Sequence, residues 1–278
     1  MTLIRSTEQF ASWRTGIPDQ SVAFVPTMGA LHTGHLKLIE SAAKQCTNVV
    51  VSIFVNALQF GDNADFEKYP RSLEIDYEAS ISAGATVVFA PTANDVFPPD
   101  FSNYLVPSDL ANHFEGASRP GHFAGVVTVV NRLFELVKPH VAIFGAKDFQ
   151  QLAVIRDMAR KLHPNIQIQS VQTIRDEDRL ALSSRNSRLN AQARIAARVI
   201  PEALFAIKSE FEAGQSDSAV LKQVALTILE NSPSMKVEYL EIVDCENLEI
   251  QEMASAQHSI ALFAGNIDGV RLIDNVEL

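Results

Sequence analysis

Cysteine is scarce in this chain, and the two that occur are Cys46 and Cys245. They stand far apart in the sequence and outside any spacing that metal ligands use, which argues against a structural zinc site. So few cysteines provide no disulfide framework, which favours a reduced, cytoplasmic setting. We therefore expect both to be small core or surface residues.

Basic clusters and long apolar runs are also absent. The formal net charge is −10 and no Lys/Arg run forms a basic face, so we expect no nucleic-acid partner. The densest apolar stretch, VVVSIFV from Val49 to Val55, is strand-sized, and the first residues carry charges. We therefore expect neither a signal peptide nor a membrane span. With 47% hydrophobic residues and a mean hydropathy of +0.06, the composition is typical of a soluble globular protein.

The first part of the chain alternates strand and helix patterns. Runs rich in Val, Ile and Phe predict strands at 22–25, 49–55, 86–90, 141–144 and 166–171. Apolar residues at helical spacing predict helices at 34–45, 73–83, 126–137 and 149–162, and a short extended piece is expected at 103–106. This alternation indicates a Rossmann-like, doubly wound parallel sheet with both faces covered.

Past about Asp176 the pattern changes. Helical patterns at 191–212 and 217–231 precede strand-like runs at 237–243, 259–263 and 270–273. We therefore expect a second, smaller α+β domain and divide the chain into 1–176 and 177–278. The polar stretch RDEDRLALSSRNSR between the two patterns is a predicted hinge or lid.

The most informative segment is PTMGALHTGH, from Pro26 to His35, where the first of these strands gives way to a helix. Gly29 and Gly34 allow the backbone to approach a ligand closely, and the N–H groups of the helix start favour an anion. His32 and His35 could donate hydrogen bonds to phosphate oxygens. A glycine turn or a lone histidine is more often structural, but the pair around Gly34 favours phosphoryl or nucleotidyl chemistry.

Polar residues follow other strands as well, at the sheet edge where open α/β folds bind ligands. Gln59 lies in NALQFG and Lys147 in GAKDFQQ, where a lysine could neutralise nucleotide phosphates. Asp148 could orient that lysine or a ribose hydroxyl, although Asp148 and Gln151 also fit a helix capping box. The run LSSR, Leu182 to Arg185, offers two hydroxyls and a guanidinium for phosphates, although Ser-Ser-Arg is also common in ordinary turns.

Two further segments carry charge. RPGHF places Arg119 and His122 around a Pro-Gly turn, where they could bind a carboxylate or phosphate. YPRSLEID carries Glu74 and Asp76, which could contact a nucleotide-bound Mg²⁺, although a solvated helix start explains each acid at least as well.

These segments together resemble the pantoate–β-alanine ligase family. The matching blocks occur in order as PTMGALHTGH, VSIFVNALQFG, YPRSLEID, RPGHFAGVVTVV, FGAKDFQQ, LALSSRN and RLIDN, the last at 271–275. They cover nearly the whole chain. The first block belongs to the wider HxGH nucleotidyltransferase group, whereas Gln59, Gln151 and RPGHF are more discriminating.

The resemblance implies that pantoate attacks the α-phosphate of ATP and that β-alanine then displaces AMP from pantoyl adenylate to give pantothenate. By the same resemblance His35 is the catalytic proton donor, supported by His32, with Lys147 and Arg185 at the phosphates. Gln59 and Gln151 would hold pantoate, with Arg119 and His122 as further substrate contacts. The ATP-binding positions implied by the match are Met28, Gly29, Ala30, Leu31, His32, Thr33, Gly34, His35, Gly145, Ala146, Lys147, Asp148, Ile174, Leu182, Ser183, Ser184 and Arg185. ATP with Mg²⁺ is expected although the metal ligands are not evident, and the family resemblance implies a homodimer formed through the N-terminal domain.

Two positions depart from the family pattern. The family usually has proline where Ala57 stands, so this loop is expected to be less rigid. It also usually has glycine where Arg179 stands, and an arginine there costs energy if the site requires a positive φ. Two alternatives stay open: a different HxGH adenylyltransferase, against which Gln59 and Gln151 argue, and a silent nucleotide-binding homologue.

Overall fold

The computed structural model describes residues 2–18, 21–61 and 66–278. Along these ranges no helix is both long and apolar enough to cross a membrane. The chain groups into two compact units, one formed by Met1–Ala146 and Gln150–Gln172, the other by Lys147–Phe149 and Thr173–Leu278. The short segment Lys147–Phe149 thus belongs to the second unit although both of its flanks belong to the first.

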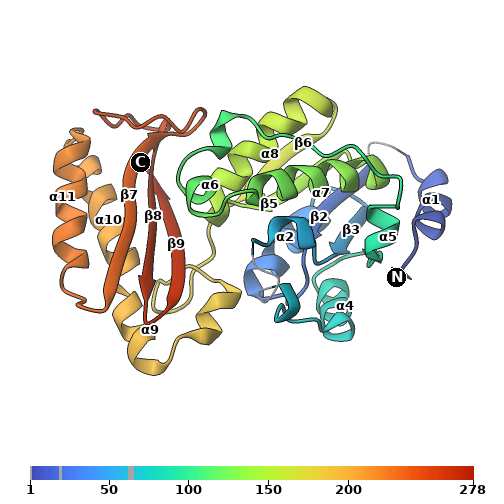
Figure 1. The fold of residues 1–278 in the computed structure, drawn as a ribbon, viewed down its shortest axis with the longest axis horizontal. Helices are drawn as coiled ribbons and strands as arrows, with labels where there is room; N and C mark the ends of the chain where they lie inside the picture. The colour runs from blue at the N-terminus through green and yellow to red at the C-terminus, as the bar shows by residue number, and fades with distance from the viewer. Residues whose placement is uncertain (1, 19–20, 62–65) are drawn as a thin grey trace. The chain divides into compact units, whose positions relative to one another are not determined.

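The first unit contains a six-stranded parallel sheet (Figure 1). Its strands stand in the order β1-β4-β3-β2-β5-β6, so the chain winds outward from β2 in both directions. The bounds are β1 Thr2–Ile4, β2 Val22–Thr27, β3 Asn48–Ile53, β4 Val87–Phe89, β5 Val141–Gly145 and β6 Gln167–Val171. The predicted doubly wound parallel fold is confirmed, and its topological switch point, where such folds bind ligands, lies between β2 and β5.

Helices cover both faces of this sheet because successive strand residues alternate between two cores. Phe24 of β2 packs with residues of α7 and α8, whereas its neighbours Ala23 and Val25 pack with residues of α2. The described helices include α1 Thr7–Thr15, α2 Thr33–Ala43, α4 Leu73–Ser82, α5 Ala93–Val96, α6 Glu115–Ser118, α7 His122–Val137 and α8 Phe149–Leu162. Both faces being buried explains why the strands read as continuous apolar runs.

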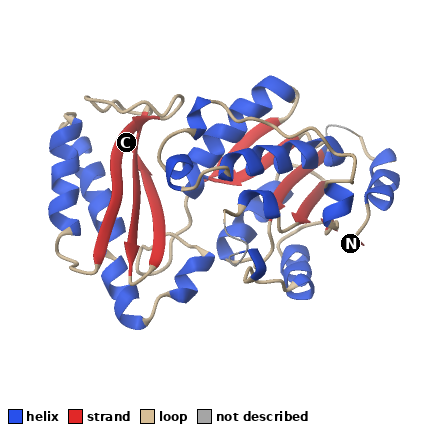
Figure 2. Ribbon diagram, in the orientation of Figure 1, coloured by secondary structure: helices blue, strands red, loops and turns tan. Residues whose placement is uncertain are grey.

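The second unit is an antiparallel sheet with helices beside it (Figure 2). Strands β7 Met235–Asp244, β8 Ser259–Ile267 and β9 Val270–Glu277 pair in that order. Their apolar side chains form a separate core with α9 Ala191–Ala197, α10 Val199–Glu212 and α11 Ser218–Leu229. The predicted α+β character is confirmed.

The structure differs from the sequence-based predictions in several places, among them helix α1, which is not predicted. Strand β1 is not expected from the sequence, because three residues at a sheet edge show no periodicity. The helix predicted over 191–212 is two helices, α9 and α10, that meet at Arg198, three residues before Pro201. Proline fits the first turn of a helix but not its interior, which is consistent with a new helix beginning here. The extended piece expected at 103–106 lies outside the regular helices and strands.

The polar stretch after β6 folds into a tight hairpin. The amide of Leu182 donates to the carbonyl of Ile174 at 2.9 Å, and Arg175 pairs with Ala181 in an antiparallel bridge. At the hairpin tip Arg179 has φ +67°, the left-handed region where glycine is favoured. Its guanidinium lies 4.4 Å from the centre of the Phe205 ring. The sequence-based suspicion that Arg179 occupies a positive-φ site is therefore correct.

Arg179 is expected to be strained by its backbone but stabilised by its ring contact. Arg179→Ala removes the contact and keeps the strain, whereas Arg179→Gly removes both. We expect the unfolding free energy of the glycine variant to exceed that of the alanine variant by about 1 kcal/mol. Urea denaturation measures this difference, and the glycine variant should unfold at the higher urea concentration. An alanine variant as stable as the glycine variant would show that the left-handed conformation costs nothing here.

Candidate active site

The two histidines after β2 cap the helix that they begin. His32 is the N-cap of α2, and its Nδ1 accepts a hydrogen bond from the amide of Gly34 at 3.1 Å. His35 reaches back in turn, and its Nδ1 accepts from the amide of His32 at 3.3 Å. The two rings lie 4.1 Å apart, centroid to centroid. This is a capping box built from imidazoles in place of the usual hydroxyl and carboxylate.

The capping geometry determines the tautomer of both rings. Because each Nδ1 accepts a backbone N–H, the single proton of each neutral imidazole sits on Nε2. His32 and His35 therefore both carry Nε2–H donors. Gly34 makes this arrangement possible, since a Cβ there would lie 2.9 Å from Cε1 of His32.

The turn before the histidines is held by a buried carboxylate from α4. Asp76 is 2% exposed, and its two oxygens accept the amides of Ala30 at 2.9 Å and Leu31 at 2.8 Å. Ala30 has φ +51° and Gly29 has φ +81°, so the chain is forced through two left-handed residues. A Cβ at Gly29 would lie 2.9 Å from Oδ2 of Asp76. Asp76 thus anchors the turn, which is a more specific role than a solvated helix start.

Two hydroxyls complete this anchor. Ser72 Oγ lies 3.2 Å from Oδ2 of Asp76, and the Tyr69 hydroxyl donates to the carbonyl of Gly29 at 3.4 Å. Burial, with a smaller contribution from the charge of Asp76, raises the pKa of Tyr69 to about 12. Tyr69 therefore remains a donor throughout the neutral range. The sequence suggested a metal contact for Asp76, but a carboxylate with both oxygens on backbone amides is poorly available to a metal.

Gln59 lies in a chain of polar contacts within the first unit. It ends the short 3-10 helix η2, Ala57–Gln59, and its Oε1 accepts from Asn56 Nδ2 at 3.2 Å. Its Nε2 lies 3.0 Å from the sulfur of Met28, which belongs to the histidine turn. The segments that follow β2 and β3 therefore meet through Gln59 and Met28.

His122 and Arg119 extend this chain from the start of α7. Nδ1 of His122 lies 2.9 Å from the carbonyl of Gln59, and Nε2 lies 3.1 Å from Nη1 of Arg119. Because the guanidinium can only donate, Nε2 is the acceptor and Nδ1 carries the proton. The structure thus brings together Gln59, His122 and Arg119, three of the four residues expected to contact the substrate, with Met28 of the expected ATP-binding turn.

Gln151 lies in the first turn of α8 and is partly exposed. Its neighbour Gln150 is buried, accepting the amide of Glu115 at 2.9 Å and donating to two carbonyls. The two glutamines in KDFQQ therefore differ in environment: Gln150 joins α8 to the segment before α7, and Gln151 retains partial access to solvent.

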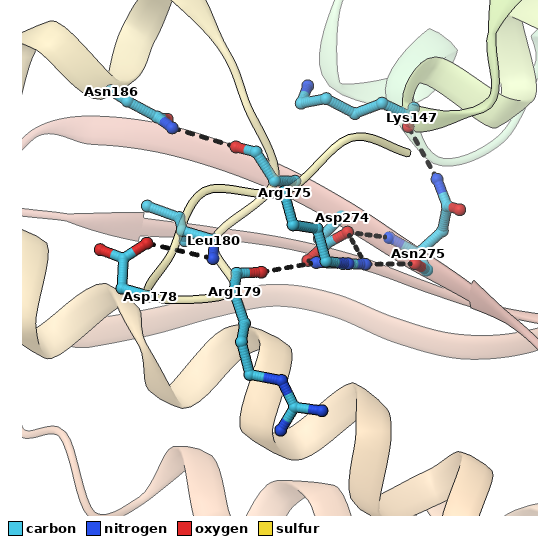
Figure 3. A network of polar contacts seen from close by, with 9 residues as sticks. Lys147, Arg175, Asp178, Arg179, Leu180, Asn186, Asp274 and Asn275 are labelled. Carbon is cyan, nitrogen blue, oxygen red and sulfur yellow. Dashed lines mark hydrogen bonds and ion pairs between the residues drawn. The ribbon is translucent and has the colours of Figure 1, made fainter. Parts of the chain in front are cut away.

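Three cations and one hydroxyl of the second unit line a small pocket. Its lining includes Lys147, Ser183, Arg185, Asn186, Arg271 and Asp274. Ser183 caps the 3-10 helix η5, Ser184–Arg188, by accepting the amide of Arg185 at 3.2 Å. Asn186 closes the base of the hairpin by donating to the carbonyl of Ala181 at 3.0 Å (Figure 3). The pocket brings Lys147 together with Ser183 and Arg185 of LSSR, whereas Ser184 is exposed.

In the parts of the chain that the structure describes, no group of three or more His, Cys, Asp or Glu side chains could hold a metal ion. Asp148 is half exposed, and its Oδ2 lies 3.8 Å from the ammonium of Lys147. The remaining predicted ATP-binding residues lie next to segments already described. Thr33 begins α2, Gly145 ends β5 and Ala146 follows it. Ile174 and Leu182 face each other across the base of the hairpin.

The model of one protein family, described as pantoate-beta-alanine ligase, matches residues 2–277. The chain belongs to the pantoate–β-alanine ligase family. Its relatives include the pantothenate synthetase of Geobacter sulfurreducens, 45% identical over 259 residues that cover 93% of this chain and 91% of the relative. The pantothenate synthetase of Geobacter sp. strain M21 is 44% identical, covering 96% of this chain and 94% of the relative.

Solved structures of the family agree in fold over the whole chain. The pantothenate synthetase of Thermus thermophilus superposes with a TM-score of 0.93 at 41% identity, covering 100% of this chain and 99% of that one. The pantoate-beta-alanine ligase of Francisella tularensis, complexed with beta-gamma ATP and beta-alanine, gives 0.80 at 34% identity, with 100% and 97% covered. The sequence-based family assignment and fold class are confirmed.

Asp76→Asn tests the anchor of the histidine turn. Its amide can accept only one of the two backbone N–H groups and turns its own N–H toward the other. We expect a loss of about 1–3 kcal/mol in unfolding free energy and a KM for ATP about tenfold higher. Chemical denaturation and steady-state kinetics measure the two effects.

Glu74→Gln, an exposed acid on the same helix, is the matched control and should change neither quantity. If both variants behaved alike, the effect would be one of helix charge and Asp76 would not be an anchor.

Proposed function

We propose that this chain joins pantoate to β-alanine in two steps. A carboxylate oxygen of pantoate attacks the α-phosphorus of ATP and expels pyrophosphate, and the amine of β-alanine then attacks the acyl carbon of pantoyl adenylate and expels AMP. The amide product is pantothenate, with one proton released. Family membership supports the overall reaction, and the observation that carries the residue assignment is that backbone amides donate to Nδ1 of His32 and His35, which leaves Nε2 of each ring as the donor.

The histidines suit the first step because they add hydrogen-bond donors where negative charge develops. As the α-phosphorus becomes five-coordinate, its oxygens gain charge that a fixed N–H donor stabilises. We assign this role to His35, with His32 supporting it from the neighbouring ring. The amides of the helix start add partial positive charge in the same direction. Since the backbone already holds both rings, little reorganisation is needed during the reaction.

The neutral groups around Gln59 suit pantoate. Amides can satisfy the hydroxyl and carboxylate oxygens of the acid without a full charge that would weaken it as a nucleophile. We assign pantoate to Gln59 and Gln151, with Arg119 acting through His122 at the edge of this region. Met28 lies against Gln59 and so couples the acid region to the histidine turn.

The second unit contributes the positive charge. Lys147, Ser183 and Arg185 line one pocket, and we propose that they bind the phosphates of ATP and stabilise the departing pyrophosphate. The ammonium offers a compact charge and the guanidinium a directional pair of donors. In this proposal 1–176 carries the nucleotide and pantoate sites, and 177–278 acts as a lid domain over the reactive adenylate.

We propose that Mg²⁺ accompanies ATP as the counter-ion of its phosphates. Mg²⁺ commonly binds through substrate phosphates and water rather than through a cage of protein ligands. No step above depends on a residue that ligates it. A homodimer and a cytoplasmic location complete the proposal, on the family resemblance and on the scarcity of cysteine respectively.

Isotope exchange between pyrophosphate and ATP isolates the first step. We expect exchange only when pantoate is present, without any need for β-alanine, and a loss of about 10²- to 10³-fold in His35→Ala, the scale of removing one transition-state donor. Exchange that proceeds equally well without pantoate would refute the assignment and favour another adenylyltransferase.

Gln59→Ala and Gln151→Ala are expected to separate the two substrates. Each should raise the KM for pantoate about tenfold or more, because an amide that contacts the acid is worth about 1–2 kcal/mol, and leave the KM for ATP within about twofold. Initial-rate kinetics with each substrate varied in turn measures this. Equal losses for pantoate and ATP would contradict the assignment.

A further inference from the structure

The motif RLIDN, 271–275 on β9, contains an acid where the strand pattern calls for an apolar residue. Leu272 and Val276 belong to the core of the second unit, and Asp274 lies between them on the same face of the strand. Asp274 is only 4% exposed. A charge at such a position is costly unless it is paired and hydrogen-bonded, so its presence needs a specific partner.

That partner is Arg175 at the start of the hairpin. Its two terminal nitrogens donate to the two oxygens of Asp274 at 2.7 and 2.9 Å, as Figure 3 shows. Arg175 also donates to the carbonyls of Asn275 and Arg179, at 3.1 and 3.0 Å. Burial raises the pKa of Asp274, and the Arg175 guanidinium opposes that rise. One buried ion pair thus ties β9 to both ends of the hairpin turn.

Asn275 makes a second long-range contact, to the segment that carries Lys147. Its Nδ2 donates to the main-chain carbonyl of Lys147 at 2.7 Å, a contact between residues 128 positions apart in the sequence. Asn275 is 6% exposed, so most of its side chain is removed from water. Figure 3 shows the Lys147 side chain extending from the backbone point that Asn275 holds.

Both ties lead to the same pocket. Lys147 lines it from one segment, Ser183 and Arg185 line it from the end of the hairpin, and Arg271 and Asp274 of β9 line it as well. The Arg185 guanidinium lies 3.5 Å from the carbonyl of Arg271, so β9 runs beside both cation-bearing segments. Neither segment belongs to a regular sheet that would fix its place.

We propose that Asp274 and Asn275 are positioning residues for the phosphate pocket. Asn275 fixes the backbone of Lys147 and so aims its ammonium, while Asp274, through Arg175, fixes the hairpin that carries Ser183 and Arg185. The role rests on the proposed function, because it takes the ligand of this pocket to be the phosphates of ATP.

A double-mutant cycle tests whether Asn275 acts through Lys147. Asn275→Ala should raise the KM for ATP about tenfold, the scale of one buried hydrogen bond, and leave the KM for pantoate within about twofold. In a Lys147→Ala background the same change should have almost no further effect, since the ammonium to be aimed is gone. Losses that multiply in the double variant would overturn the proposal, because a purely structural asparagine would act independently of Lys147.

Asn266→Ala is the matched control. Asn266 is another asparagine of the same sheet, its side chain accepts a backbone amide, that of Gly269, at 2.9 Å, and it does not line the pocket. This variant should leave the KM for ATP unchanged even where it lowers stability. An equal rise in the KM for ATP would overturn the proposal.

Asn275→Asp keeps the size of the side chain and removes the N–H donor. This variant replaces Asn275→Ala in the kinetic test if the alanine variant does not fold. It should show the same selective loss for ATP. If neither variant folds in a thermal scan, Asn275 is a structural residue and the proposal fails.

The binding of a non-hydrolysable ATP analogue separates this proposal from the proposed function. Calorimetry should show a weaker Kd in Asn275→Ala than in the unaltered chain, whatever acid the enzyme activates. If the unaltered chain binds the analogue but shows no pantoate-dependent exchange, the proposed function fails and the role of Asn275 is still measured. If the chain is active and Asn275→Ala binds normally, this inference alone fails.

Discussion

The hydrogen bonds from two backbone amides to the Nδ1 atoms of His32 and His35 are the constraint on which the proposed chemistry depends. They satisfy donors that would otherwise be unpaired at the start of α2. They also decide which nitrogen of each ring carries its proton. The same hydrogen bonds thus cap the helix and orient the Nε2–H donors. A doubly protonated ring would lose its capping hydrogen bond because its Nδ1 could no longer accept.

Elsewhere in the structure, buried polar side chains from distant segments fix the loops that carry functional groups. Asp76 binds the two amides of the turn that leads to His32. Asn275 binds the carbonyl of Lys147, and Asp274 binds the hairpin through Arg175. In each case an irregular loop that carries functional groups is fixed by a side chain on a helix or strand. Such loops have no ladder of their own to fix them, so a buried partner supplies the rigidity that pre-organised sites require.

The sequence predicts the parts of this structure that arise from periodicity. The helix expected over 149–162 is α8 with the same bounds, and the alternation of apolar strands and helices correctly indicates a parallel sheet. The pattern fails where a signal is short or continuous across a break. Strand β1 is too short to show a period, and the apolar spacing of α9 and α10 runs through Arg198.

Contacts between distant residues are what the sequence could not supply. Motif residues such as His35, Gln59 and Lys147 stand out because their types and spacing suggest chemistry. The sequence offers Asp76 only as one of two acids at a helix start and Asn275 only as part of RLIDN, and neither signal reveals an anchoring role. One signal was available for β9: Asp274 interrupts an alternating apolar face, which implies a buried partner. Only the structure identifies that partner as Arg175.

Long-range ¹H–¹⁵N NMR of histidine-labelled protein measures the central feature most directly, because it reports which ring nitrogen carries the proton. At neutral pH both His32 and His35 are expected to be neutral with the proton on Nε2, and His35→Ala and His32→Ala variants assign the signals. A proton on Nδ1 of either ring, or a doubly protonated ring, would contradict the arrangement from which the roles of the two histidines follow.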